Sequence, residues 1–213
     1  MKKIFIFSFV MIISFTNAIF SQNISIGARA GLNLSSMFIK EGSYSFNDNL
    51  SMLTGFHINP YVEYSFSDKF ALEGGLSFQT RGFIFNETDM IRQKITPHYL
   101  DIPINAKFYF NIGKPKIYVY VGPYLGIGLF GKEKQYRNDA LLSERTLEWG
   151  QYIPADLNRI DFGINGGVGI DINNFSIGAQ YGYGFLNVST LDNYGIKMHN
   201  YVINISIGYK FDL

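Results

Sequence analysis

The chain has 213 residues, no cysteine and a formal charge of +1, with 18 basic against 17 acidic residues. This balance excludes a strongly basic nucleic-acid-binding surface, and the lack of cysteine excludes disulfides, thiolate metal sites and a cysteine nucleophile. Aromatic residues make up 17% and charged residues 16% of the sequence, alongside 22 glycines, which favours aromatic-rich strands joined by flexible turns.

The N-terminal residues follow the order of a secretory signal peptide. Lys2 and Lys3 precede an apolar run over residues 4–15, and small and polar residues follow up to Ser21. We expect cleavage after Ala18 or after Ser21 and prefer Ser21, which divides the chain into a signal peptide, 1–21, and a mature barrel domain, 22–213. An uncleaved anchor is the alternative, but the run is shorter than the ~20 residues that a spanning helix needs.

Eight stretches then alternate between apolar and polar or small residues with the period of two that is typical of β-strands. They cover approximately 24–35, 53–66, 70–83, 98–110, 116–131, 159–172, 175–187 and 200–213. No helical pattern of comparable quality competes, and residues 138–144 form only a weak helical patch.

Short and long connections between these stretches alternate strictly. Tight turns are predicted at 67–69, 111–115 and 173–174, and longer links at 36–52, 84–97, 131–158 and 188–199. This asymmetry is typical of an outer-membrane barrel with short periplasmic turns and long external loops. The predicted fold is therefore all-β: an eight-stranded, up-and-down, antiparallel transmembrane β-barrel with both ends of the chain on the periplasmic side.

A soluble, lipocalin-like barrel is the alternative that explains the same alternation. In such a barrel the apolar face would point inward and charges would cover the outside, but here the charged residues share a face with small ones. Aromatic residues also gather at the ends of the apolar strand faces near the short turns, as in the aromatic girdle of a membrane barrel: Tyr64, Phe66, Phe70, Phe108, Phe110, Phe175, Tyr209 and Phe211.

The charges on the polar strand faces should project into one narrow lumen. An unpaired buried charge costs several kcal/mol, so we expect these side chains to form a lumenal network of salt bridges and hydrogen bonds. A proton or small-ion path is the alternative. The predicted network consists of Arg29, Glu63, Glu73, Arg81, Asp101, Lys107, Arg159, Asp161, Asp171 and Lys210.

The segment 116–131 contains the pattern G-x-G-x-x-G at 126–131, which can mark a dinucleotide site. Such a site needs a helix that begins at the glycines, and here Lys132, Glu133 and Lys134 intervene without any βαβ pattern. We interpret the glycines as room for lumenal side chains. Pro123 lies in this strand and cannot donate to a ladder, so a bulge or a missing ladder bond is predicted there.

No residue pattern predicts catalysis, a metal or a cofactor. The histidines His57, His98 and His199 are widely spaced and lack metal-ligand spacing. We interpret His98 and His199, near the predicted loop bases, as polar rim residues, and a role in external binding is the alternative. The long link 131–158 is the best candidate for external contacts, since it mixes charges with Tyr136, Tyr152 and Trp149, the only tryptophan. Deletion of 136–152 is expected to spare barrel assembly.

Four motifs resemble the outer-membrane β-barrel proteins of Bacteroidetes known as the PorT family: GARAGLNLS at 27–35, YLDIPINAK at 99–107, VGPYLG at 121–126 and DFGINGGVG at 161–169. The resemblance covers essentially the whole mature chain. The resemblance implies a membrane barrel. The founding member of the family is linked to secretion and gliding, but these four motifs do not extend that link to this chain. Leu213 departs from the terminal aromatic of many such barrels.

These observations predict an integral outer-membrane protein with a side-chain-filled lumen and a structural or interaction role in the cell envelope. The alternatives are a narrow transport channel, an outer-membrane enzyme and a secreted soluble carrier. The expected partners are outer-membrane lipid, the barrel-assembly machinery during biogenesis, through Tyr209, Phe211 and Leu213 together, and an envelope protein at the external loops. No nucleic acid is expected.

Overall fold

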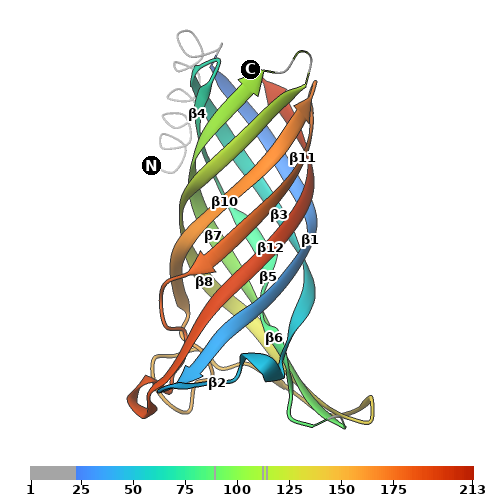
Figure 1. The fold of residues 1–213 in the computed structure, drawn as a ribbon, viewed down its shortest axis with the longest axis vertical. Helices are drawn as coiled ribbons and strands as arrows, with labels where there is room; N and C mark the ends of the chain where they lie inside the picture. The colour runs from blue at the N-terminus through green and yellow to red at the C-terminus, as the bar shows by residue number, and fades with distance from the viewer. Residues whose placement is uncertain (1–22, 89, 112, 114) are drawn as a thin grey trace, which may run out of the picture.

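The computed structural model describes residues 23–88, 90–111, 113 and 115–213, and the predicted signal peptide lies outside them. In this part of the chain, eight antiparallel strands close into a barrel in sequence order, counting three short pieces as one interrupted strand (Figure 1). β1 pairs with both β3 and β12, which closes the ring. The strands are β1 (Ile24–Glu41), β3 (Leu50–Ser67), the interrupted strand β4 (Phe70–Gly75), β5 (Ser77–Thr80) and β6 (Phe83–Asn86), then β7 (Ile91–Asn111), β8 (Lys116–Arg137), β10 (Ile160–Ile172), β11 (Phe175–Gly184) and β12 (Ile196–Asp212).

The two ends of the barrel differ in their connections. At the short-turn rim, neighbouring strands are joined by turns at 68–69 and 173–174 and by the short connection from Asn111 to Lys116 (Figure 1). The backbone N–H of Leu213 donates to the carbonyl oxygen of Ile24 at 3.0 Å. The long-loop rim carries the remaining connections, with the short pieces β2 (Tyr44–Ser45) and β9 (Ala140–Thr146) and the 3₁₀ turns η2 (Asn47–Asn49) and η3 (Asp192–Tyr194). The predicted fold class and alternation of connections are confirmed.

The barrel wall is apolar on its outside and polar on its inside. Leu32 and Ile207 are 65% and 69% exposed on the outer face, whereas Glu63 and Lys107 are buried in the lumen. This inside-out distribution is opposite to that of a soluble barrel, and it suits a wall that faces lipid. In the described part of the chain, no helix has the length and apolar character needed to cross a membrane.

Aromatic rings form a belt on the outer face near each rim. The short-turn belt includes a stacked Phe66–Phe70 pair at 5.4 Å between ring centroids. The second belt includes His98, whose imidazole stacks on Phe78 at 5.6 Å. His98 and Phe108 lie ten positions apart along β7. At ~3.4 Å per residue and a tilt of about 40° this distance spans roughly 26 Å across the membrane, close to the ~25 Å apolar band of membrane barrels.

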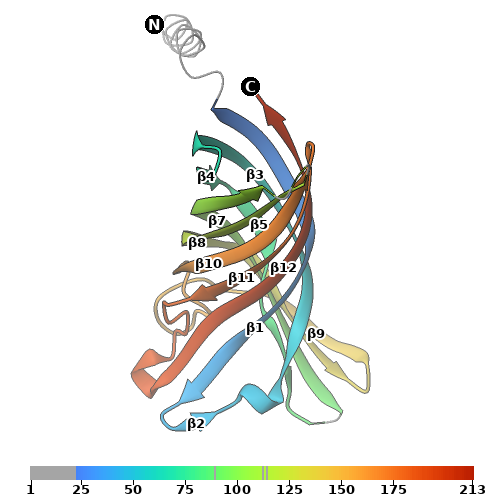
Figure 2. The ribbon, with the colours of Figure 1, turned by 45° about the horizontal axis from the view of Figure 1, so that its top comes forward.

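The long-loop rim extends further as strand than the sequence predicts. β7 begins at Ile91 instead of near 98, and β8 continues to Arg137 instead of ending near 131. The prediction of a weak helical patch at 138–144 is wrong, because these residues form a turn and most of β9. β9 pairs with β8 in a projecting hairpin (Figure 2). Cross-strand pairing therefore overrides the local helical preference beyond the apolar band.

The pairing of β7 with β8 is interrupted at Pro123, where the sequence predicts an irregularity. The register passes from Pro103↔Tyr124 directly to Ala106↔Val121, so Ile104 and Asn105 lie opposite Pro123 and Gly122 outside this ladder. The register with β10 is unbroken through Ile164↔Pro123. Of the two predicted outcomes, the missing ladder pairing is confirmed and a bulge at Pro123 is not found.

Two irregularities close in the chain to Arg81 and Asp101 were not predicted. Between β7 and β8, the pair His98↔Phe130 is followed by Tyr99↔Gly128, which leaves Leu129 as the extra residue of a bulge. In the interrupted strand, Gly82 has φ of 124° between β5 and β6, and a Cβ there would lie 2.0 Å from the Ile95 carbonyl oxygen. Glycine is required at this break, next to the lumenal Arg81.

Candidate functional site

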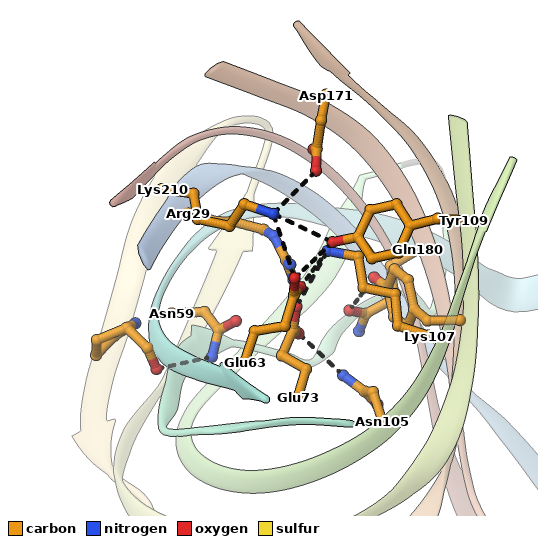
Figure 3. Close-up of polar contacts among 12 residues, drawn as sticks. Arg29, Asn59, Glu63, Glu73, Asn105, Lys107, Tyr109, Asp171, Gln180 and Lys210 are labelled. Carbon is orange, nitrogen blue, oxygen red and sulfur yellow. Dashed lines mark hydrogen bonds and ion pairs between the residues drawn. The ribbon is translucent and has the colours of Figure 1, made fainter. Parts of the chain in front are cut away.

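The lumen contains two separate groups of ionic side chains. Near the short-turn rim, three cations face three carboxylates in what we call the short-turn cluster (Figure 3). Arg29 forms a bidentate salt bridge with Glu73, Lys107 contacts Glu63 at 2.8 Å and Glu73 at 3.5 Å, and Lys210 reaches Glu63 at 3.2 Å and Asp171 at 3.5 Å. The cluster is charge-balanced, consisting of Arg29, Lys107, Lys210, Glu63, Glu73 and Asp171.

The long-loop cluster lies at the level of the second aromatic belt and is built around Arg81. Its guanidinium forms salt bridges with Asp101 and, at 2.9 Å, with Asp161. Asp161 also accepts hydrogen bonds from the Tyr124 hydroxyl at 3.1 Å and from the Asn200 amide at 3.0 Å. All three charged side chains are at most 4% exposed, and one cation here faces two carboxylates.

Tyrosine rings complete the coordination of the lumenal cations. Arg81 lies between the rings of Tyr99 and Tyr124, with its guanidinium carbon 4.9 and 4.8 Å from their centroids. The ammonium nitrogen of Lys107 lies 3.9 Å from the centroid of Tyr118. The ring face attracts each cation, so a tyrosine contributes both bulk and electrostatic stabilisation inside the wall.

Between the two clusters lies a layer of amide and hydroxyl side chains with little free space. The cavity there has a volume of about 30 Å³, room for only a water molecule or two. His57, Asn105, Asn165 and Asn204 line it, and each has one buried side-chain atom without a hydrogen-bond partner in the described protein. A polar cavity of this size suits ordered water and not a bound organic molecule.

The glycines of the G-x-G-x-x-G pattern have steric roles. A Cβ at Gly126 would lie 2.7 Å from Oδ1 of Asp101, and one at Gly128 would lie 2.2 Å from the indole ring of Trp149. Gly184 plays the same part for Asp161, where the corresponding distance is 2.6 Å. This geometry agrees with the interpretation that these glycines leave space for side chains inside the barrel.

An apolar mouth cluster closes the lumen on the loop side of the long-loop cluster. Its buried members come from the wall and from both loops that fold over the opening: Met37, Phe83, Leu147, Leu157 and Val188. Trp149 packs against this cluster and meets Tyr99 edge to face at 5.6 Å. The predicted external contact residue Trp149 therefore points largely into the mouth.

The other two candidate contact residues lie in different surroundings. Tyr136 belongs to β8 and not to a loop, and the guanidinium of Arg92 lies 5.1 Å from its ring centroid. Tyr152 is 69% exposed in the loop that follows β9. Of the three candidate contact residues, only Tyr152 thus presents most of its surface to the outside.

Arg159 was wrongly predicted to face the lumen. It lies just before β10, is exposed, and makes no ion pair within the described residues. The Gly128 N–H donates to its backbone carbonyl at 2.7 Å, and the interior at this level is occupied by the Trp149 ring over Gly128. The guanidinium consequently lies outside the lumen.

The loop between β9 and β10 is held by ionic contacts outside the apolar band. Arg145 donates to both oxygens of Asp156 at 2.8 and 2.7 Å, and the Glu148 N–H donates to Asp156 at 2.8 Å. Partial burial raises the pKa of Asp156, but these hydrogen bonds outweigh burial and hold the pKa below its ordinary value. The stabilisation is present at neutral pH and is lost as the pH falls through the folded-state pKa.

The family model described as "Outer membrane protein beta-barrel domain" matches residues 20–190. The chain belongs to this family. The apolar outer wall of this outer-membrane β-barrel protein therefore faces the lipid of the outer membrane. Its short-turn and long-loop rims lie on the two sides of that membrane.

Solved barrels of low sequence identity resemble this outer-membrane β-barrel protein. Ail of Yersinia pestis is 19% identical, with 89% of this chain and 99% of that chain covered and a TM-score of 0.43. OprG from Pseudomonas aeruginosa is 16% identical, with 90% and 98% covered and a TM-score of 0.45, and Neisserial surface protein A is 14% identical, with 88% and 97% covered and a TM-score of 0.41. No curated protein matches the sequence. At these identities the similarities identify neither a ligand nor an activity.

Several side chains that donate hydrogen bonds to the lumenal carboxylates of this outer-membrane β-barrel protein were not predicted from the sequence. Tyr109 donates to Glu63 at 2.7 Å, and Gln79 and Asn200 donate to the carboxylates of the long-loop cluster. The signal that could have found them is strand parity, since Tyr109 follows Lys107 by two residues and so shares its face. Among the described residues, no group of three or more histidine and carboxylate side chains is arranged to hold a metal ion.

Proposed function

We propose that this outer-membrane β-barrel protein is a closed, non-catalytic scaffold that presents its long-loop rim to a protein partner in the cell envelope. The observation that carries the proposal is the filled lumen. Two ion-paired clusters and the apolar mouth cluster succeed one another along it, and the polar layer between the ionic clusters leaves a cavity of about 30 Å³. Because the interior has little space for a solute, the accessible chemistry lies at the rim.

The projecting hairpin of β8 and β9 supports this choice of surface. All seven residues of β9 are exposed, and β9 pairs on one side only, with β8, in the described sheet. Leu141 and Leu142 are more than half exposed. A free strand edge with apolar side chains is a template for a partner's strand. The resemblance to the PorT family of Bacteroidetes favours an envelope partner. Its founding member's link to secretion makes a secretion-associated partner a candidate, although the shared motifs do not themselves carry that link.

A photo-crosslinking amino acid placed at Leu142 should capture a discrete protein partner in native outer membranes. The same crosslinker at Asn173, in a turn of the short-turn rim, is the matched control and should not capture that partner. The products are resolved on gels and identified by mass spectrometry. Equal products from both positions, or none from Leu142, would count against the docking surface.

The purified protein should produce no stepwise conductance in planar lipid bilayers. The expected result follows from the ion pairs, since a permeating ion would have to displace buried charges that are already compensated. The readout is current at fixed voltage over a range of salt concentrations. Steady single-channel steps would overturn the closed scaffold and favour the narrow transport channel.

A further inference from the structure

A pocket of about 510 Å³ opens at the long-loop rim, between the loop after β9 and the loop that joins β11 to β12. This volume lies within the ~300–1,000 Å³ of small-molecule sites. The pocket shares no lining residue with the lumenal cavity, and its Trp149 packs against the mouth cluster. Its lining includes Trp149, Tyr152, Arg159, Asn187, Asp192 and Asn193.

The walls of the pocket are braced against each other. The Asn158 side-chain amide donates to the carbonyl oxygens of Asn187 at 3.3 Å and Ser189 at 3.2 Å, and the Thr190 hydroxyl donates to the Ala155 carbonyl at 2.8 Å. These bonds join the two loops directly. Leu157 and Val188, at 3% and 0% exposed, anchor the same loops in the mouth cluster. The pocket is therefore largely pre-formed, which reduces the entropic cost of binding.

The chemistry of the lining selects among ligand classes. Arg159 supplies one positive charge and Asp192 one negative charge, and the Asn187 amide donates to Asp192 at 2.9 Å. The lining thus has no net charge to favour an anion or a cation. Its remaining polar groups are amides and hydroxyls, which both donate and accept, beside the rings of Trp149 and Tyr152.

From this combination we infer that the pocket binds a neutral saccharide. Vicinal hydroxyls match the paired donors and acceptors of the Asn193 amide, the Asp192 carboxylate and the Arg159 guanidinium. The apolar face of a sugar ring fits against an aromatic side chain such as Tyr152. The inference goes beyond the scaffold function and does not depend on a protein partner at the hairpin.

Two sources could supply such a sugar at the cell surface: the polysaccharide of the surrounding outer leaflet, and free mono- and disaccharides outside the cell. Both offer the same hydroxyl-rich rings. The experiment therefore has two arms, one with polysaccharide released from the organism's own outer membrane and freed of lipid, the other with glucose, galactose, mannose, N-acetylglucosamine and maltose.

Trp149 reports on the pocket without a label, because it is the only tryptophan of the chain and lines the site. The full-length protein in detergent micelles is titrated with each sugar up to about 50 mM, a range that covers weak millimolar sites. We expect a saturable change of Trp149 emission, matched by the heat of binding in calorimetry. Tyr152→Ala should weaken the affinity about tenfold, since the ring contributes stacking and not folding.

The matched control is Tyr44→Ala, which removes a ring 62% exposed on β2, outside the pocket, and should leave the affinity unchanged. Binding in the first arm alone supports the membrane polysaccharide as the source, and binding in the second arm supports a free sugar. Absence of a saturable response in both arms, or equal weakening by Tyr152→Ala and Tyr44→Ala, would overturn the saccharide site.

Discussion

Replacing Arg81 by glutamine should lower the free energy of unfolding by about 3–5 kcal/mol. Arg81 is 2% exposed and is the only cation in ion-pair contact with Asp101 and Asp161 among the described residues. Glutamine keeps much of the side-chain length but leaves both carboxylates buried without a compensating charge. The variant also loses the cation contacts with the rings of Tyr99 and Tyr124.

Asp101→Asn is the matched control for this prediction. It leaves Arg81 paired with Asp161 in a one-to-one salt bridge, so the free energy of unfolding should change by only about 1 kcal/mol. Both variants are compared by urea titration in lipid vesicles, with Trp149 emission as the reporter, and by the temperature at which the folded band disappears on gels. Equal losses in the two variants would contradict the assigned role of Arg81.

The apolar face of the barrel could be predicted because side chains along a β-strand alternate between its two faces with a period of two residues. Along the strands near the apolar band, every second side chain faces lipid, so Val119, Val121 and Leu125 lie outside while Tyr118 and Tyr120 lie inside. Face assignment needs only parity within a strand. For the same reason, most of the lumenal charges could be listed before their partners were known.

The partners themselves could not be read from the sequence. Lys210 pairs with Glu63 across 147 positions of the chain, and the lumen offers each charge several candidates on other strands. Which pair forms depends on the stagger of the strands around the barrel. Parity also fails at irregularities, because the bulge at Leu129 places both Leu129 and Phe130 on the outer face.

The limits of the strands at the long-loop rim were the least predictable part of the candidate site. Beyond the apolar band, β7 and β8 carry mostly polar and charged residues, interrupted by a few such as Ile91 and Ile95, and such strands resemble loops in composition. The position of Arg159 shows the consequence. Its parity matches that of Asp161, but the strand begins at Ile160, so parity no longer determines where its side chain points.

Deleting residues 136–152 should weaken the long-loop end of the barrel, contrary to the expectation from sequence that this segment is dispensable. The deletion removes Leu147, which is 4% exposed in the mouth cluster, and Trp149, whose ring covers Gly128. Loss of a buried leucine alone costs about 2–5 kcal/mol, and the apolar surfaces of Leu157 and Val188 would become accessible to water. The single variant Leu147→Ala should have the same effect in milder form.

A variant with a shorter hairpin distinguishes the contribution of the mouth cluster from that of the exposed strands of the hairpin. Replacing residues 134–144 by Asn-Gly keeps the pair Glu133↔Arg145 beside a two-residue turn and retains Leu147 and Trp149. Limited trypsin digestion measures the result at Arg159, which lies next to the anchored loop. We expect faster cleavage after Arg159 in the 136–152 deletion and in Leu147→Ala, because loosening of the mouth cluster frees this loop, and an unchanged rate in the shortened hairpin. Unchanged cleavage in Leu147→Ala, or equally fast cleavage in the shortened hairpin, would show that the mouth cluster does not hold the loop.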